Sequence, residues 1–275
     1  MMRTFASPRM PWRFVPVTTP VAEQVAALNE IGPTMLAGYT SALQVLAHEA
    51  RAGRLRIAPA IVATTSEPLL PEGRALLEET FGATVVNVWA TSEGVTAASC
   101  GSGDPWLHVA DDLAVVEPVD ALGRAVEPGV TSDRILVTNL YNHALPLIRY
   151  EITDQLTLLD GGCRCGSLHR RITDPLGRLD DVFRYGEVPV HPHVFRSPLS
   201  RHPEIVEYQV RQTPRGAAVA VRSARDLDTV AVAGEIRAAL AAVGVPDAEV
   251  SVHPVDVLPR GSSGKLARFV PLGTG

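Results

Sequence analysis

The sequence predicts an α/β protein with three parts: a short parallel sheet, an antiparallel sheet or small barrel attached to it, and a compact α+β module. In the first third of the chain, two apolar runs rich in β-branched residues flank a helical segment, and this order favours parallel strands in an open sheet. The middle third holds strands separated by turn residues, without intervening helices. Beyond Gly177, a strand, strand, helix, strand pattern indicates a separate module.

The first third is expected to contain the binding edge of the parallel sheet. Its expected elements are helices at residues 21–31 and 41–55, a strand at 57–64, a helix at 71–81 and a strand at 84–89. Pro71 suits the first position of the third helix, and Gly82 suits its end. Ligands of open α/β sheets bind beyond the carboxyl ends of the strands. Both Ser66-Glu67-Pro68 and Ala90-Thr91-Ser92-Glu93-Gly94 follow such ends, so both segments are candidates for a binding site.

The rest of the chain is expected to hold two further groups of strands. Those of the middle part are expected at residues 113–119, 135–140, 147–152 and 156–159. Those of the last part are expected at 205–212, 217–222 and 249–253, with a helix at about 230–243. A boundary near Gly177 divides the chain into a large domain, residues 1–177, and a small C-terminal domain, residues 178–275.

The composition is that of an ordinary globular protein. The chain has 275 residues, of which 46% are apolar, and a formal net charge of −5. A chain of this length can bury a core without disulfide support, and its mild acidity argues against a nucleic-acid partner. No apolar stretch reaches the roughly 20 residues of a membrane helix. The N-terminus lacks the apolar core of a signal peptide, so we expect a cytoplasmic protein with no membrane partner.

The basic residues are unevenly divided, since 24 are arginine and one, Lys265, is lysine. The lysine lies in Leu258-Pro-Arg-Gly-Ser-Ser-Gly-Lys265, a Gly- and Ser-rich segment whose free backbone N–H groups and cation suit an anion such as phosphate. The segment is not a P-loop, because the four-residue spacing between glycines is absent. The alternative interpretation is a flexible exposed loop in which the lysine is incidental.

Four motifs, in chain order, resemble those of the adenylate-forming ligase superfamily, which includes the acyl-CoA synthetases. Val88-Trp89-Ala90-Thr91-Ser92-Glu93-Gly94 resembles the aromatic-Gly-x-Ser/Thr-Glu motif, and Leu147-Ile148-Arg149-Tyr150-Glu151-Ile152-Thr153-Asp154 resembles the Arg-Tyr-x-x-x-Asp segment. Gly177-Arg178-Leu179-Asp180-Asp181 resembles the hinge motif, and Pro259-Arg260-x-x-Ser263-Gly264-Lys265 resembles the C-terminal lysine motif. Within the superfamily the chain is most similar to the phenylacetate–coenzyme A ligase family. The segments that carry this similarity are Gly38-Tyr39-Thr40-Ser41-Ala42-Leu43, Ser66-Glu67-Pro68-Leu69, Leu136-Val137-Thr138-Asn139-Leu140 and Cys163-Arg164-Cys165-Gly166.

The resemblance implies a two-step reaction that uses ATP, Mg²⁺ and coenzyme A. A carboxylate attacks the α-phosphate of ATP to give acyl-AMP and pyrophosphate, and coenzyme A then displaces AMP to form a thioester. Two anions meet in the first step, so a cation and a metal ion are needed where negative charge concentrates. Lys265 would bridge the carboxylate and the α-phosphate as a compact point charge, a task for which the planar arginine side chain is a poor substitute. Glu93 would hold Mg²⁺.

The resemblance also implies a nucleotide site and an acid pocket. The residues it assigns to the nucleotide are Ser66, Glu67, Pro68, Trp89, Ala90, Thr91, Ser92, Asp154 and Arg178. Asp154 would accept hydrogen bonds from the ribose hydroxyls, and Asp180 would be the hinge about which the small domain turns. Residues around Tyr39 would shape the pocket for an aryl or small acyl acid. Taken singly, Glu93 could be a helix-start acid, and the two aspartates could be turn residues.

The sequence departs from the family pattern at several positions. Trp89 takes the place of the usual tyrosine, Ala90 replaces the usual glycine, and Ser66 stands where a glycine-containing adenine loop is expected. Nothing before Leu28 resembles the Ser/Thr/Gly-rich phosphate-binding loop that family members carry in a further N-terminal portion. We therefore expect a partial fold of this superfamily and low activity of the chain by itself.

Two further expectations come from the lack of a segment that resembles the phosphate-binding loop. One is an alternative function: a non-catalytic nucleotide-binding remnant, or a subunit whose site is completed by a separate N-terminal chain. The other is an exposed core face, which predicts a homodimer or poor solubility.

The three cysteines carry a separate signal. Cys163 and Cys165 are too close in sequence for an unstrained disulfide. Together with Cys100 and His108 they could complete a tetrahedral set of three sulfurs and one nitrogen, the type that suits structural zinc. His169 competes as the fourth ligand. The Cys-x-Cys spacing is less diagnostic than Cys-x₂-Cys, so small buried thiols are the alternative interpretation.

Overall fold

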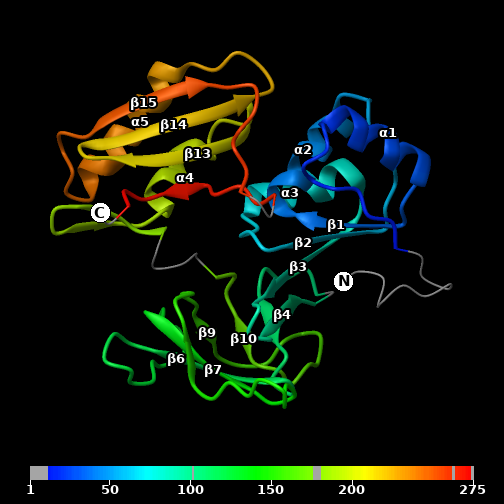
Figure 1. Ribbon diagram of the computed structural model, residues 1–275, viewed down its shortest axis with the longest axis vertical. Coiled ribbons are helices and arrows are strands. Elements are labelled where there is room, and N and C mark those ends of the chain that lie inside the picture. Colours follow the sequence, from blue (N-terminus) through cyan, green and yellow to red (C-terminus); the bar gives the residue numbers. More distant parts are fainter. Residues whose placement is uncertain (1–11, 101, 176–180, 262–263, 274–275) are drawn as a thin grey trace.

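The computed structural model describes residues 12–100, 102–175, 181–261 and 264–273. The described elements form a mixed α/β structure with one partly parallel sheet, two antiparallel sheets and a mixed sheet in the C-terminal part, so the predicted fold class is confirmed. Figure 1 shows an N-terminal part with helices packed beside strands, a middle part made of strands, and a C-terminal part with its own sheet. No helix of the described residues is long and apolar enough to cross a membrane.

The largest sheet has seven strands and changes from parallel to antiparallel along its width. Its order is β1 (Met35–Tyr39), β2 (Ile61–Thr65), β3 (Thr84–Ala90), β4 (Thr96–Ser99), β5 (Leu107–Val109), β10 (Arg171–Ile172) and β9 (Leu158–Leu159). The first three strands pair in parallel, and all later pairs are antiparallel. The sheet therefore runs continuously from the N-terminal part into the middle part.

Three helices cover one face of the parallel strands. They are α1 (Val21–Ile31), α2 (Thr40–Arg51) and α3 (Pro71–Phe81), and their buried side chains form one core with Leu36, Val62 and Val85 of the strands. On the other face, Met35 is 45% and Ile61 is 37% exposed. Parallel sheets in proteins are generally covered on both faces. Met35 and Ile61 therefore leave an apolar patch exposed on this face of the sheet.

The middle part is a second layer packed on the antiparallel half of the large sheet. Its sheet consists of β6 (Ala114–Val119), β7 (Arg134–Asn139) and β8 (Tyr150–Ile152), all antiparallel. Alternate residues of β7 are buried, and Ile135 and Val137 share one core with Leu107 of β5 and Ile172 of β10. This alternation of buried residues marks the inner face of a two-layered β structure.

The C-terminal part has a separate core around a four-stranded sheet. Its elements are β11 (Phe183–Tyr185), β12 (Val188–Val190), α4 (His193–Leu199), β13 (Ile205–Thr213), β14 (Gly216–Ser223), α5 (Thr229–Ala242), β15 (Glu249–Pro254) and β16 (Phe269–Val270). The sheet order is β15-β14-β13-β16. Phe183, Phe195 and Phe269 pack together in the core. The side chain of Asp228 begins α5 by accepting hydrogen bonds from two N–H groups of its first turn.

Some predicted boundaries differ from the observed ones. The helix expected to run to residue 55 ends at Arg51, and the strand expected from residue 57 begins at Ile61, because the turn after α2 and the segment around Pro59 lie between them. The strand expected at 147–152 begins only at Tyr150, because Arg149 has a φ of +50°, outside the extended region. The predicted domain boundary near Gly177 lies outside the described residues.

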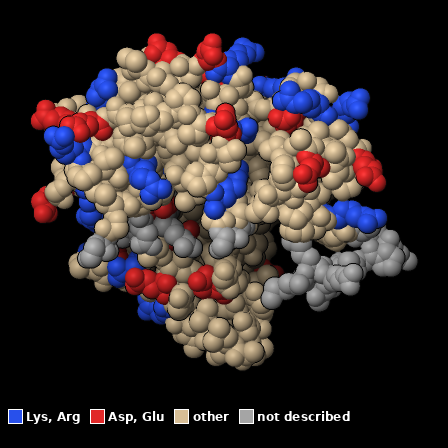
Figure 2. Space-filling view, turned by 45° about the horizontal axis from the view of Figure 1, so that its top comes forward, with Lys and Arg blue, Asp and Glu red and all other residues tan. Residues whose placement is uncertain are grey.

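Charged residues of both signs are mixed on one face of the molecule. On the face seen in Figure 2, basic and acidic side chains are interspersed over the upper part of the view. This part of the surface therefore presents no strong electrostatic field of one sign.

Candidate active site

The carboxyl ends of three parallel strands bring the predicted segments to one edge of the large sheet. Backbone pairing places Tyr39, the last residue of β1, opposite Thr65 of β2, and Thr65 opposite Val88 of β3. The Ser66-Glu67-Pro68 segment follows β2 directly, and the hairpin of residues 91–95 follows β3. Because α2 begins at Thr40, its N-terminus, whose first N–H groups have no acceptor within the helix, lies at the same edge.

Lys265 reaches this edge from the C-terminal part. Its Nζ lies 6.0 Å from the ring centroid of Tyr39. The loop around it is closed by two backbone hydrogen bonds, from Gly261 N–H to the Lys265 carbonyl at 3.0 Å and from Gly264 N–H to the Gly261 carbonyl at 2.8 Å. Gly264 has a φ of +81°, and a Cβ atom there would lie 2.3 Å from Cγ1 of Val17. Only glycine allows this conformation and this close approach.

Glu67 joins the start of α2 to the lysine loop. Its carboxylate accepts hydrogen bonds from the N–H of Ser41 at 2.7 Å and the hydroxyl of Ser41 at 3.1 Å. It also accepts one from the N–H of Leu266 at 3.3 Å. A carboxylate at a helix N-terminus is stabilised by the free N–H groups there. The residue that the sequence assigned to the adenine therefore also connects two segments of the site.

Two arginines that flank the lysine make further contacts between the C-terminal part and α2. Arg260 donates to Oγ of Ser41 at 3.3 Å and pairs with Glu207 of β13. Arg268 donates to Oε1 of Gln44 in α2 at 3.0 Å. The sequence analysis gave no role to any of these residues. Arg260 and Arg268 flank the lysine motif, and this proximity is the one signal that could have found them.

The hairpin between β3 and β4 carries Glu93 and is closed by its own backbone. Thr91 N–H donates to the Val95 carbonyl at 3.0 Å, and Gly94 N–H donates to the Thr91 carbonyl at 3.1 Å. Gly94 has a φ of +95°, and a Cβ atom there would lie 2.3 Å from Nδ2 of Asn139, which donates to the Glu93 carbonyl. The Thr91 hydroxyl is buried without a hydrogen-bond partner among the residues described. The hairpin thus contains an orphaned polar group in the segment predicted to contact phosphate.

The other predicted nucleotide residues lie in different surroundings. Trp89 is half-buried against the core of the middle part, Pro68 is half-buried, and Ala90 and Ser92 are exposed. Asp154 is 8% exposed and lies two residues beyond β8. Arg178 and the predicted hinge residue Asp180 lie outside the described residues.

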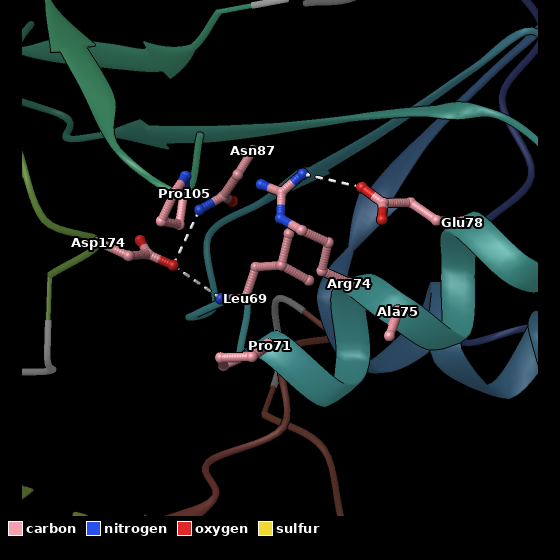
Figure 3. Close-up of a pocket in the computed structure, with 8 residues that line it drawn as sticks. All are labelled: Leu69, Pro71, Arg74, Ala75, Glu78, Asn87, Pro105 and Asp174. Atoms are coloured by element: carbon pink, nitrogen blue, oxygen red, sulfur yellow. Dashed lines mark hydrogen bonds and ion pairs between the residues drawn. The ribbon is translucent and has the colours of Figure 1, made fainter. Parts of the chain in front are cut away.

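A polar cluster that the sequence analysis did not find holds the chain just after Pro68. Oδ2 of Asp174 accepts hydrogen bonds from Leu69 N–H at 3.0 Å and from Nδ2 of Asn87 at 2.9 Å, and Figure 3 shows both. Oδ1 of Asn87 in turn accepts one from the Thr64 hydroxyl at 2.9 Å. Asp174 therefore links the end of the middle part to β2, to β3 and to the predicted adenine segment.

The pKa of the Asp174 carboxyl group is raised above its ordinary value. Burial raises the pKa of Asp174 to about 6, while the hydrogen bonds from Leu69 and Asn87 act in the opposite direction. Removing a carboxylate from water disfavours its charged form, and two donors compensate for only part of this loss.

The three cysteines and His108 meet at the other end of β4 from the hairpin. Their ligand atoms all lie within 4.8 Å of one another. All three cysteines are free of disulfides. His169, the competing candidate, instead lies with its backbone carbonyl 3.2 Å from Nδ1 of His108. The predicted set with His108 is thus the one that could hold a metal ion.

Comparison with known proteins finds relatives in one group of enzymes. No family model matches the chain. The chain is 28% identical over 206 residues to a phenylacetate-coenzyme A ligase of Thermus thermophilus, an alignment that covers 71% of this chain and 46% of the relative. The chain thus spans about half the length of this curated relative.

Solved structures show the same fold. A 2-hydroxyisobutyryl-CoA ligase in its postadenylation state, in complex with an acyl-AMP, has a TM-score of 0.74 at 19% identity. This match covers 91% of the present chain and 57% of the ligase. The same ligase in its thioesterification state, with CoA also bound, has a TM-score of 0.53 over 94% and 58% of the two chains.

Proposed function

Because this chain is a homologue of the phenylacetate-coenzyme A ligases and has the fold of the adenylate-forming ligases, we propose that it activates a carboxylic acid with ATP to give acyl-AMP and passes the acyl group to coenzyme A. The observation that carries the proposal is the contact between the lysine loop and the sheet edge: Lys265 Nζ lies 6.0 Å from the Tyr39 ring, and Leu266 N–H donates to Glu67. Residues from opposite ends of the chain thus meet where a ligand of such a sheet binds.

In the proposed adenylation step, Lys265 stabilises the meeting of two anions. The carboxylate of the acid attacks the α-phosphate, a P–O bond forms, and pyrophosphate leaves with the electron pair of the broken bond. Negative charge concentrates between the carboxylate and the phosphate, and a compact ammonium group can lie close to both. An aryl or small acyl chain would lie beside Tyr39.

The residues present fit a magnesium-bound nucleotide. Glu93 offers a carboxylate, the ligand type that Mg²⁺ prefers, and the orphaned Thr91 hydroxyl offers a hydrogen-bond donor to a phosphate oxygen. Ser66, Glu67 and Pro68 would line the adenine, with Trp89 and Ala90 beside the phosphate segment. Asp154 would accept hydrogen bonds from the ribose hydroxyls. Arg178 would contact the ribose or a phosphate group, and Ser92 would contact a phosphate group. Bound Mg²⁺ would supply neutralisation of phosphate charge.

The transfer to coenzyme A requires that the C-terminal part moves. In the present arrangement its contacts with α2 include the polar pairs of Arg260 with Ser41 and of Arg268 with Gln44. Water can replace such partners at little net cost, so these pairs can separate. A rotation about Asp180 would remove Lys265 from the edge and open it for the thiol of coenzyme A. The higher TM-score with the postadenylation state supports an adenylation arrangement here.

Isotope exchange between ATP and pyrophosphate tests the first step. Purified protein is assayed with a panel of aryl and short acyl acids, and at least one acid should support exchange. Lys265→Ala should lower that exchange at least about 100-fold. Arg237→Ala removes an exposed cation from α5, far from the lysine loop in sequence, and should leave the exchange within about twofold. Exchange that survives Lys265→Ala would refute the role given to the lysine.

A second candidate is a nucleotide-binding subunit that needs another polypeptide for catalysis. Two observations favour it: the match covers 46% of the relative, and Met35 and Ile61 expose an apolar sheet face that parallel sheets normally bury. Calorimetric titration with a non-hydrolysable acyl-AMP analogue separates the two candidates. Binding without exchange for any acid supports the second, whereas exchange by the chain alone excludes it.

A further inference from the structure

We infer that Cys100, His108, Cys163 and Cys165 bind one Zn²⁺ ion in a closed, structural site. This inference is independent of the proposed ligase activity, because none of the four residues is assigned to the nucleotide or the acid. The cluster joins two loops that are far apart in the sequence, and all four potential ligands come from the protein. A site with four protein ligands leaves no open position for a substrate, which is the property of structural zinc sites.

The spacing of the ligand atoms is that of a tetrahedron around zinc. With Zn–S bonds of about 2.3 Å and Zn–N bonds of about 2.0–2.1 Å, a regular tetrahedron has S···S edges of about 3.8 Å and S···N edges of about 3.6 Å. In the structure, Sγ of Cys100 and Sγ of Cys163 are 3.6 Å apart, and Sγ of Cys165 and Nε2 of His108 are 3.5 Å apart. Two independent edges therefore match the size of a zinc site.

The surroundings orient the histidine for metal binding. Nδ1 of His108 lies 3.2 Å from the backbone carbonyl of His169, a group that can only accept a hydrogen bond. This partner assigns the proton to Nδ1 and leaves the lone pair of Nε2 directed to the sulfur cluster. A metal-binding histidine nearly always donates its other ring N–H in this manner. Among the described residues, His108 rather than His169 has a ring nitrogen grouped with the three sulfur atoms.

The surroundings of the sulfur atoms also include a hydrogen-bond donor and a cation. Ser167 N–H lies 3.5 Å from Sγ of Cys165. The guanidinium of Arg164, between the two neighbouring cysteines, pairs with Asp104 of the other loop at 2.6 Å. Three thiolates and one Zn²⁺ leave a net charge of −1, and the Ser167 N–H and the nearby guanidinium suit a negatively charged centre.

The two loops have no apolar core of their own in the described part of the chain. Leu168 beside the cluster is fully exposed, and the core of the middle part ends at Leu107 and Ile172 in the strands below. A metal ion can replace such a core by fixing both loops at once. It would also fix Cys100 at the end of β4, the strand that starts at the Glu93 hairpin.

Metal analysis of the full chain tests the inference. Protein expressed with added zinc and purified without chelators should contain about one zinc per chain. Its zinc X-ray absorption spectrum should show three sulfur atoms near 2.3 Å and one nitrogen near 2.0–2.1 Å. This spectrum requires no variant, so a folding defect cannot obscure it. Protein without zinc, a shell of oxygen and nitrogen only, or a Cys100–Cys163 disulfide in the purified chain would each overturn the inference.

Paired histidine variants identify the fourth ligand. His108→Ala should lower zinc affinity at least about tenfold, as measured by competition with a chromogenic chelator. His169→Ala is the matched control: the contact to His108 comes from the His169 backbone, so its side chain can be removed and the zinc content should stay at about one per chain. Equal zinc loss in both variants, or loss in His169→Ala alone, would contradict the assigned site.

Discussion

The two ends of β4 hold distant segments together by different means. At the start of the strand, the neighbouring sheet edge meets the lysine loop through single hydrogen bonds and ion pairs, such as Leu266 to Glu67 and Arg260 to Ser41. At its other end, three sulfurs and an imidazole lie at the spacing of one metal ion. Single polar contacts can be exchanged for contacts with water when two segments separate, whereas four ligands on one ion cannot be released separately. We therefore expect the first junction, named the opening junction below, to separate during the proposed reaction, and the second, with its proposed zinc ion, to stay closed.

The largest effect on the opening junction is expected from Gly264→Ala. The new Cβ would meet Val17 at 2.3 Å, and the φ of +81° is strained for alanine, so the lysine loop must shift. A displacement of about 1 Å can reduce a reaction about 100-fold, and we expect a loss of that order in pyrophosphate exchange. Gly273→Ala, where a Cβ meets nothing within 4 Å, is the control. Unchanged exchange in Gly264→Ala would show that activity does not depend on the close packing of Gly264 against Val17.

Asp174→Asn tests the fixed connection between the adenine segment and the sheet. The pKa of this carboxyl rises from 3.8 in the unfolded chain to about 6 in the folded protein. The folded state therefore binds more protons between pH 4 and 6, and the stability contributed by this group is lost as the pH rises through that window. The amide of the variant does not titrate. As the pH rises from 4 to 7, the free energy of unfolding of the variant should therefore increase by about 2 kcal/mol relative to that of the wild type.

Denaturant unfolding of both proteins across this pH range measures the difference. The two curves should converge near pH 4 and separate by pH 6. A constant difference between them would mean that Asp174 titrates normally in the folded protein.

Arg260→Ala weakens the opening junction and also removes one hydrogen bond within the lysine loop, from Arg260 to the Gly264 carbonyl at 3.3 Å. The variant loses the contacts with Ser41 and Glu207, while Glu207 keeps its pair with Arg222 at 3.0 Å. One hydrogen bond to a charged group is worth about 1.5–3 kcal/mol, so exchange should fall about tenfold or more. Arg215→Ala breaks an exposed pair with Glu249 in the same part and should have almost no effect. Equal exchange rates for the two variants would contradict the role of Arg260 in docking.

The smallest effect is expected from Ser66→Gly. Ser66 has a φ of +65°, where glycine is unstrained and serine is not. The substitution should stabilise the folded protein by about 0.5 kcal/mol, after the larger entropy of the unfolded glycine chain is taken into account. Ser92→Gly, at a position without a positive φ, should instead destabilise it by a similar amount. Thermal unfolding of both variants measures the contrast, and a loss of stability in Ser66→Gly would show that the serine side chain contributes more than the strain costs.

The fold was predictable where local chemistry fixes an element. The helix at Pro71–Phe81 has both expected bounds, because proline fits its first turn and Gly82 adopts a φ of +60° at its end. Strands of two or three residues, such as β10 and β16, escaped prediction because they are too short to show a period. β1 escaped because its five residues, Met-Leu-Ala-Gly-Tyr, contain a glycine, lack β-branched side chains and do not alternate between apolar and polar.

Less of the site could be predicted from the residues alone. Lys265 stands out as the single lysine, and the cysteine set stands out by residue type. Arginines are abundant in this sequence, and only their nearness to Lys265 distinguishes Arg260 and Arg268 from the others. Their partners on α2 lie more than 200 positions away, and only the folded chain brings them together. Asp174 is equally inconspicuous, because its role depends on the two donors that the fold places beside it.

Protection of the single lysine tests the central claim most directly. An amine-reactive reagent can modify only Lys265 and the N-terminal amine, and peptide mass analysis distinguishes the two. If Lys265 lies between the acid and the α-phosphate, Mg-ATP plus an activating acid, or an acyl-AMP analogue, should slow its modification at least about tenfold, with the N-terminal amine as the internal control. Equal rates of modification with and without these ligands would contradict the placement of Lys265 in the adenylation site.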